Sequence, residues 1–210
     1  MFDELKYREE ICEIMNRLYS KGLISSVGGN TSVISREDNF ILITPTGLDK
    51  MNIKPKDIVK VGLNGEVIGE GSPSSEIINH LSIYKERTDI FAIVHAHPST
   101  AVGIISAGYI PRSVTPEYIV MVRNLIAVDF ATPGEESIKG LTDALKKSDI
   151  ALLKNHGVFS VGFSLMQAFS RIEVLEEASK IVVAGKAFGG IPELTDKQID
   201  DVINKYVKKS

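Results

Sequence analysis

The pattern of hydrophobic and polar residues predicts helices and strands along the whole chain. Apolar residues recur every three or four positions between Phe2 and Lys21, which indicates an amphipathic helix that ends at Gly22. Positions 30–35 and 40–44 then read as paired strands around a polar turn. We therefore expect a packing helix followed by antiparallel sheet.

A second hairpin is expected downstream. Apolar segments at 57–63 and 66–71 flank the dipeptide Asn64-Gly65, which is typical of a two-residue type I′ turn. A helix then begins near Pro73, and an apolar strand runs up to His95 and His97. The first third of the chain is thus predicted to be mostly antiparallel sheet.

Beyond the histidines the pattern continues to alternate. It predicts a short helix after Pro98, a strand at 125–131, a helix at 133–149 and an apolar strand before His156. Capping-box patterns begin at Ser164, for a long helix that ends at Gly185, and at Thr195, for a final helix. These elements indicate an α/β fold of the α+β type, with a central, mainly antiparallel sheet flanked by helices.

Composition supports a single domain spanning residues 1–210. The chain has 43% hydrophobic residues, enough for a full core, and neither a linker nor a low-complexity segment divides it. The net charge is −3 and no basic stripe appears, so we expect no nucleic-acid partner. No apolar run reaches transmembrane length, so no membrane association is expected, and the single Cys12, read as a small buried group, fits a cytoplasmic location.

Candidate metal ligands gather in two apolar segments that end in Pro or Gly. In a strand, alternate residues point to one face, so His95 and His97 present both imidazoles to the same side. With His156 and the carboxylate of Glu76 they form a set suited to Zn²⁺, and Co²⁺, Mn²⁺ or Fe²⁺ would also fit. His80 lies on the same helix face as Glu76 and is a rival candidate ligand. For each of these histidines the alternative is a buried core residue that binds no metal.

The polar turns also suggest places where an anion can bind. Gly28 and Gly29 permit close approach of the backbone to a ligand, and Asn30 offers an amide donor. Ser74 and Ser75, at a helix start, can cap free N–H groups or donate to a phosphate. The alternative for the two glycines is a tight turn without a ligand, and the alternative for the two serines is a plain helix cap.

Four ordered motifs carry a family resemblance. They are Pro45-Thr46-Gly47, Pro73-Ser74-Ser75-Glu76, Val-His-Ala-His-Pro ending at Pro98, and Asn155-His156-Gly157. The chain resembles the class II aldolase and adducin-head family from Gly22 to the C-terminal helix, and within it the enzymes that cleave L-fuculose 1-phosphate. The resemblance implies a three-layer fold, one Zn²⁺ per subunit, and a homotetramer with its sites at subunit interfaces.

The implied reaction is metal-dependent cleavage of L-fuculose 1-phosphate, or a similar ketose 1-phosphate, to dihydroxyacetone phosphate and L-lactaldehyde. In the resembling enzymes the metal is held in the resting site by the positions of Glu76, His95, His97 and His156, and Glu76 leaves the metal to act as general base when substrate binds. The resemblance assigns the substrate phosphate to Asn30, Thr46, Gly47, Ser74 and Ser75. It points to Tyr206 as an aromatic residue that closes over the substrate, and Glu117 replaces an expected tyrosine as a candidate proton donor.

Three other functions remain open within the family. Pentulose-5-phosphate 4-epimerases resemble this chain but typically carry Asp where Glu76 stands. Methylthioribulose-1-phosphate dehydratases share the frame, and Glu117 is the residue that keeps this activity open. A non-catalytic interaction domain, as in the adducin head, would be expected to lack the ligands, and here all four are present.

Overall fold

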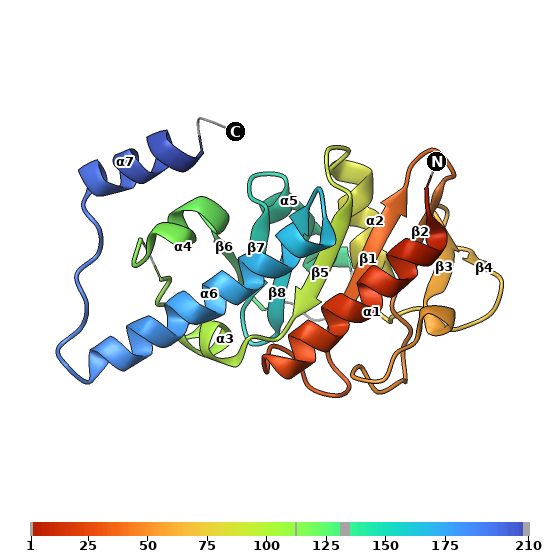
Figure 1. Ribbon diagram of the computed structural model, residues 1–210, viewed down its shortest axis with the longest axis horizontal. Coiled ribbons are helices and arrows are strands. Elements are labelled where there is room, and N and C mark those ends of the chain that lie inside the picture. Colours follow the sequence, from red (N-terminus) through yellow and green to blue (C-terminus); the bar gives the residue numbers. More distant parts are fainter. Residues whose placement is uncertain (1, 112, 131–134, 208–210) are drawn as a thin grey trace.

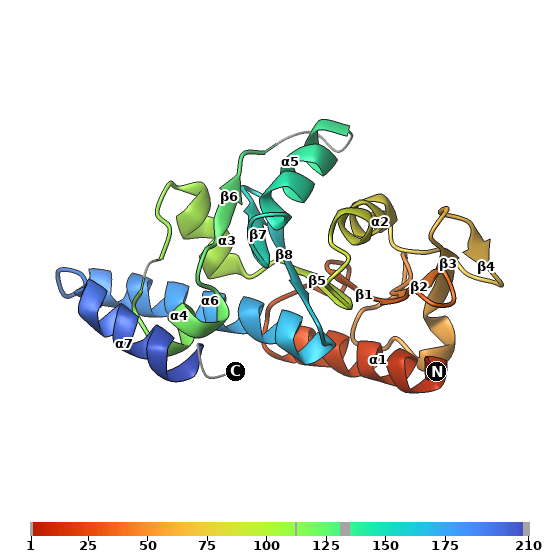
Figure 2. The same cartoon turned by 90° about the horizontal axis from the view of Figure 1, so that it is seen from above.

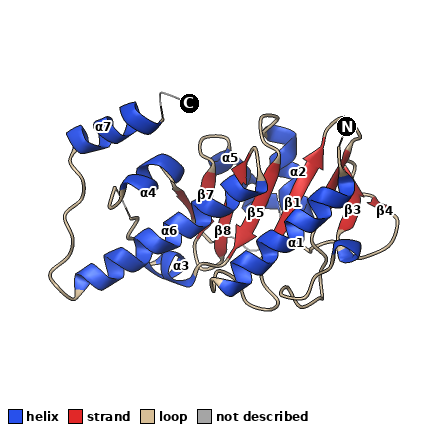
Figure 3. Ribbon diagram, viewed as in Figure 1, coloured by secondary structure: helices blue, strands red, loops and turns tan. Residues whose placement is uncertain are grey.

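The computed structural model describes residues 2–111, 113–130 and 135–207, and its core is an eight-stranded sheet between two layers of helices (Figures 1 and 3). The strands are β1 (Asn30–Ser35), β2 (Phe40–Ile43), β3 (Val59–Gly62), β4 (Val67–Ile68), β5 (Ala92–Ala96), β6 (Ile126–Val128), β7 (Ile150–Leu153) and β8 (Gly157–Gly162). The helices are α1 (Glu4–Ser20), α2 (Ile77–Glu86), α3 (Ser99–Ser106), α4 (Pro116–Met121), α5 (Glu135–Leu145), α6 (Leu165–Lys186) and α7 (Asp196–Tyr206), with a 3₁₀ turn η1 (Pro55–Asp57).

The strand order is β4-β3-β2-β1-β5-β8-β7-β6, and only the β6–β7 pair is parallel. Strand β5 lies in the middle, paired with β1 and β8. In this register Asn30 lies opposite His95 on one side, and Phe159 lies opposite His95 on the other. The predicted mainly antiparallel sheet is confirmed, and its central strand carries the first candidate ligand.

Helices cover both faces of the sheet, as Figure 2 shows from above. Helices α1 and α6 pack on one face, with α3 and α4 beside α6, whereas α2 and α5 cover the other. Each face has its own apolar core, because alternate residues of the central strands point to opposite sides: Val94 joins the core under α1 and α6, and Ile93 the core under α2 and α5. The predicted three-layer fold is therefore confirmed. No described helix is long and apolar enough to cross a membrane.

The C-terminal helix α7 lies apart from the sheet (Figure 1) and packs on α4. Its capping box is formed as predicted, since Thr195 accepts from the N–H of Gln198 and the side chain of Gln198 accepts from the N–H of Thr195. No residue of α7 is buried. Helix α4 is the element that α7 contacts most.

The predicted turn between β3 and β4 is wrong in type. Gly65 has φ +88°, but Asn64 does not share a positive φ, as a type I′ turn would require. The carbonyl of Gly62 accepts from the N–H of Gly65, and the N–H of Gly62 donates to the carbonyl of Glu66, both at 2.8 Å. The loop therefore has three residues and a bulge at Gly65.

Other predicted boundaries shift. Helix α6 continues through Gly185 to Lys186, and Gly185 lies so close to Ile191 that an added Cβ would be 2.4 Å from its side chain. Glu117 lies in helix α4 rather than in a loop. The predicted strand end at residue 131 and the predicted helix start at 133–134 lie outside the described residues.

Candidate metal centre

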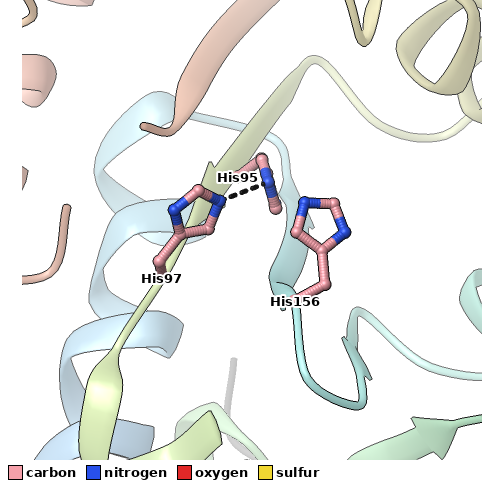
Figure 4. Close-up of side chains that lie close together, drawn as sticks. All are labelled: His95, His97 and His156. Carbon is pink, nitrogen blue, oxygen red and sulfur yellow. Dashed lines mark hydrogen bonds between the residues drawn. The ribbon is translucent and has the colours of Figure 1, made fainter. Parts of the chain in front are cut away.

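The end of β5 supplies two imidazoles that face each other (Figure 4). His95 is fully buried and stacks on Phe159, with ring centroids 4.0 Å apart. Its Nδ1 donates to the carbonyl of Val158 at 3.0 Å, so its Nε2 is the ring nitrogen that faces the site. The Nε2 of His97 lies 3.0 Å from that atom. The prediction that both rings share one face is confirmed.

The third imidazole comes from the turn between β7 and β8 (Figure 4). Asn155 has φ +59°, and its N–H donates to the hydroxyl of Ser106 at 2.8 Å, which fixes the turn that carries His156. The ring of His156 lies 5.0 Å from that of His95 and 5.5 Å from that of His97. One nitrogen from each ring lies within 4.8 Å of the other two. We call His95, His97 and His156 the histidine group.

Glu76 faces the histidine group from the start of α2. It is the N-cap residue, one position before the helix, and its own side chain makes no capping hydrogen bond. The carboxylate lies 3.1 Å from Nε2 of His95 and 3.6 Å from Nε2 of His156, and it accepts a 2.6 Å hydrogen bond from the amide of Asn30. Burial alone would raise the pKa of Glu76, but His95, Asn30 and His156 hold it well below its usual value. Glu76 is therefore a carboxylate.

This donor set fits a divalent cation. Nε2 of His95 lies 3.1 Å from a carboxylate oxygen of Glu76, and the opposite ring nitrogen is engaged with the carbonyl of Val158, so Nε2 is the nitrogen that this ring offers to an ion. Burial, and then the neighbouring imidazoles, lower the pKa of His97 to about 4, so His97 is neutral at pH 7, and burial and His95 also lower the pKa of His156. Neutral imidazoles are the form that binds metal.

A buried chain of hydrogen bonds lies behind Glu76. The amide oxygen of Asn30 accepts from Nε2 of His80 at 2.6 Å, and Nδ1 of His80 accepts from the hydroxyl of Ser32 at 2.7 Å. That hydroxyl lies 2.9 Å from the hydroxyl of Tyr84. Both nitrogens of His80 are thus engaged in hydrogen bonds, so this rival ligand offers no free nitrogen to an ion. The chain orients the Asn30 amide so that its NH₂ group faces Glu76.

Two glycines make room for the imidazoles. A Cβ atom on Gly157 would lie 2.6 Å from the carbonyl oxygen of Ala96, 2.6 Å from a ring carbon of His97 and 2.9 Å from one of His95. A Cβ on Gly28 would lie 2.6 Å from Nδ1 of His97. The sequence predicts that Gly28 lies close to a ligand or forms a tight turn, and the packed structure shows that Gly28 and Gly157 both border the rings.

The ligands open onto a cavity of about 720 Å³. Four of the predicted phosphate-binding residues line it, namely Asn30, Thr46, Ser74 and Ser75. Gly47, with φ +73°, adjoins Thr46 but is not among the lining residues. Lys50, Asn155 and Phe130 also line the cavity, and sequence analysis gave none of them a role there.

Backbone hydrogen bonds bring the lining segments together. The N–H of Thr46 donates to the carbonyl of Ser72, and the N–H of Ser74 donates to the carbonyl of Thr44. Pro45 and Pro73 therefore lie opposite each other across a short β-bridge. Thr46, Ser74 and Ser75 are held side by side by this pairing, which the sequence alone does not reveal.

Two predicted catalytic residues lie elsewhere. Glu117 is exposed in the first turn of α4, and Tyr206, the last residue of α7, is 53% exposed. Neither is among the residues that line the cavity. A single chain therefore does not bring Glu117 or Tyr206 to the histidine group, and their catalytic roles stay predictions.

Comparison with known proteins agrees with this geometry. Residues 9–183 match the model of the Class II Aldolase and Adducin N-terminal domain, and the chain belongs to that family. It is 34% identical over 206 residues to 5-deoxy-D-ribulose 1-phosphate aldolase of Bacillus thuringiensis serovar kurstaki, which covers 96% of this chain and 95% of that protein. It is 32% identical over 186 residues to 3-oxo-tetronate 4-phosphate decarboxylase of Escherichia coli, covering 85% and 87%.

A solved structure named L-fuculose 1-phosphate aldolase is also similar. Its TM-score is 0.84 at 32% sequence identity, over 95% of each chain. The relatives share the fold but differ in the substrate that their names give. The family is thus shown, and the particular substrate is a separate question.

Proposed function

We propose that this protein is a metal-dependent aldolase that cleaves L-fuculose 1-phosphate, or a similar ketose 1-phosphate, to dihydroxyacetone phosphate and an aldehyde such as L-lactaldehyde. One observation carries the proposal: three imidazoles and the Glu76 carboxylate converge on one side of a cavity whose other lining residues offer hydroxyl and amide donors. The sugar-phosphate aldolases among the similar proteins support the same reaction.

The histidine group and Glu76 would hold the ion. Zn²⁺ suits three nitrogens and one oxygen, and Co²⁺, Mn²⁺ or Fe²⁺ would suit them too. When bound, the ion acts as a Lewis acid that stabilises negative charge developing on the carbonyl oxygen of the substrate. The hydrogen bond from Nδ1 of His95 to Val158 orients the ring so that Nε2 is its ligand nitrogen.

Glu76 is the proposed general base, a role that it would take after substrate replaces it as a ligand. In the synthetic direction its carboxylate takes a proton from the hydroxymethyl carbon of dihydroxyacetone phosphate, and that carbon then forms the new bond to the aldehyde. In cleavage the same carboxyl returns the proton. The Asn30 amide, held by His80, keeps the carboxylate aimed at the cavity. Tyr206 or Glu117 of a neighbouring subunit is the proposed donor to the aldehyde oxygen.

The substrate phosphate would bind among Asn30, Thr46, Gly47, Ser74 and Ser75. The hydroxyl groups and backbone N–H groups near the start of α2 can donate to phosphate oxygens, and the positive end of the helix dipole favours an anion there. No lysine is needed as a Schiff-base nucleophile in this mechanism.

A neighbouring subunit is part of the proposal. Val27, Ile78 and Phe130 line the cavity, yet they are 82%, 58% and 61% exposed. Apolar side chains this exposed at a cavity favour coverage by another molecule, which supports the expected homotetramer. Light scattering of the purified protein tests this, and a monomer would remove the proposed route by which Tyr206 and Glu117 reach the site.

A second candidate is decarboxylation of a 3-oxo sugar-acid phosphate, which the name of the Escherichia coli relative favours. The same ion would stabilise the same kind of charge after loss of carbon dioxide. The dehydratase alternative rested on Glu117, which is exposed on α4 in the single chain. An adducin-like role without catalysis would not require the converging ligands.

The test incubates zinc-loaded protein with dihydroxyacetone phosphate and either L-lactaldehyde or acetaldehyde, and detects ketose 1-phosphate by NMR. We expect product with the wild type and a loss of at least about a hundredfold with Glu76→Gln, because general bases contribute about 10²- to 10⁴-fold. Glu86→Gln is the matched control, since Glu86 lies at the other end of α2 and pairs with Lys146 on the surface.

If zinc is bound but neither aldehyde gives product, the aldolase proposal is wrong. Release of carbon dioxide from 3-oxo-tetronate 4-phosphate would then support the second candidate. Equal loss of activity in Glu76→Gln and Glu86→Gln would contradict the role of Glu76 as base.

A further inference from the structure

Lys50 is a buried cation beside the proposed phosphate site. It is 4% exposed and lines the same cavity as Asn30, Thr46, Ser74 and Ser75. Its backbone N–H donates to the carbonyl of Ser26 at 2.9 Å, so its loop is fixed against the segment that leads to Gly28. The sequence showed only a lysine in a polar turn.

The ammonium group of Lys50 is incompletely satisfied. Its Nζ donates one hydrogen bond, at 2.6 Å, to the carbonyl of Pro45, and an ammonium has three donors. Within the described residues no carboxylate lies within 4.0 Å of it, and burial lowers its pKa with no acidic group offsetting the shift. A buried charge without a counter-ion is costly, so this group favours an anion in the cavity.

The other side chains proposed to hold the phosphate are neutral. Asn30, Thr46, Ser74 and Ser75 can donate hydrogen bonds, but they cannot balance the charge of a phosphate monoester. Glu76 adds a negative charge at the same cavity. A cationic side chain would strengthen the binding of a phosphorylated substrate at this end of the cavity, and Lys50 is the one lysine or arginine among the described residues that line it.

We propose that Lys50 is the charged donor for the substrate's phosphate and determines the preference for phosphorylated over unphosphorylated ligands. This inference deepens the proposed function, because it assigns a role at the same site. The hydrogen bond from Lys50 to the carbonyl of Pro45 places the ammonium charge beside Thr46. The bridge between Pro45 and Pro73 brings Ser74 next to the same group. Phosphate would replace solvent around the two remaining donors.

The test measures binding directly, by calorimetry, with glycerol 3-phosphate and inorganic phosphate as probes. We expect Lys50→Met to raise the Kd of glycerol 3-phosphate by about tenfold to a hundredfold, the usual effect of losing a charge-assisted hydrogen bond. Lys50→Arg should retain most of the affinity. Lys56→Met is the matched control, since Lys56 is exposed on η1, and it should change the Kd by less than about threefold.

An unchanged Kd in folded Lys50→Met, or an equal rise in Lys56→Met, would overturn the inference. Thermal unfolding shows whether the variant folds. If it does not, the ammonium ¹⁵N resonance of Lys50 is followed in the wild type while inorganic phosphate is added, with Lys50→Arg used to assign it. A resonance that does not shift while phosphate binds would also overturn the proposal.

Binding without turnover separates this inference from the aldolase proposal. If no aldehyde is joined to dihydroxyacetone phosphate, yet Lys50→Met weakens glycerol 3-phosphate, the aldolase reaction is wrong and the phosphate role stands. If aldol product forms and its KM for dihydroxyacetone phosphate is unchanged in Lys50→Met, the reaction stands and the role of Lys50 is wrong.

Discussion

The histidine end of the sheet and the C-terminal helices differ in how firmly each holds its candidate residues. At the sheet, His95 is fully buried and hydrogen-bonded, and Glu76 is fixed by Asn30 and His80. In the C-terminal region, α7 has no buried residue, and Tyr206 is half exposed. A single chain therefore holds the metal ligands in position by itself. Glu117 on α4 and Tyr206 on α7 would need contact with another subunit to be positioned at the site.

The largest expected effect comes from removing a ligand. His97→Ala should weaken Zn²⁺ binding by more than about a hundredfold, since even groups that only support ligands contribute about 10- to 100-fold. Competition with a chromophoric chelator measures the affinity. Tyr206→Phe, from the other region, should leave it unchanged. Full retention of zinc by His97→Ala would show that the histidine group is not the metal site.

Gly157→Ala should disturb the same region without replacing a ligand. The new methyl group would meet the Ala96 carbonyl at 2.6 Å, and backbone cannot easily move, so we expect a loss of about 1–3 kcal/mol in the free energy of unfolding and weaker zinc binding. Gly103→Ala in α3 is the control, because nothing lies within 4 Å of its added Cβ. Equal behaviour of the two variants in urea unfolding would contradict the packing argument.

Lowering the pH should reduce the free energy of unfolding through His80. Burial lowers the pKa of His80 to about 3 in the folded chain, against about 6.5 when unfolded. Between these values only the unfolded state binds the proton, so stability falls as pH falls, by about 1 kcal/mol from pH 7 to 5.5 for this group.

Urea unfolding of the metal-free wild type and of His80→Gln at both pH values isolates the contribution of His80. Glutamine does not titrate, so the variant should lose about 1 kcal/mol less than the wild type over this interval. The same pH dependence in both proteins would mean that His80 is not the titrating group.

The smallest effects are expected in the C-terminal region. Tyr206→Phe and Glu117→Gln change exposed side chains, so the free energy of unfolding should stay within about 0.5 kcal/mol and zinc content should not change. On the prediction that they act from a neighbouring subunit, each variant should lower kcat while the assembly persists. Unaltered kcat in both would remove their proposed catalytic roles, and lost zinc would contradict the separation of the two regions.

The sequence by itself determined the local elements and the ligand types. Strand alternation placed His95 and His97 on one face, and the pairs Ser164/Gln167 and Thr195/Gln198 marked two helix starts that the structure confirms. These features depend on the periods of helices and strands and on neighbours within four residues, so the order of residues suffices to predict them.

Only the tertiary structure decided which distant residues meet. Asn30 lies 46 positions from Glu76 and 50 from His80, and their contacts follow from the register of β1 on β5 and the packing of α2 over it. Tertiary packing likewise decides the close fit of the imidazoles around Gly157, the bridge from Pro45 to Pro73 and the burial of Lys50. Such approaches are set by sheet register and by packing between layers, which no local pattern records.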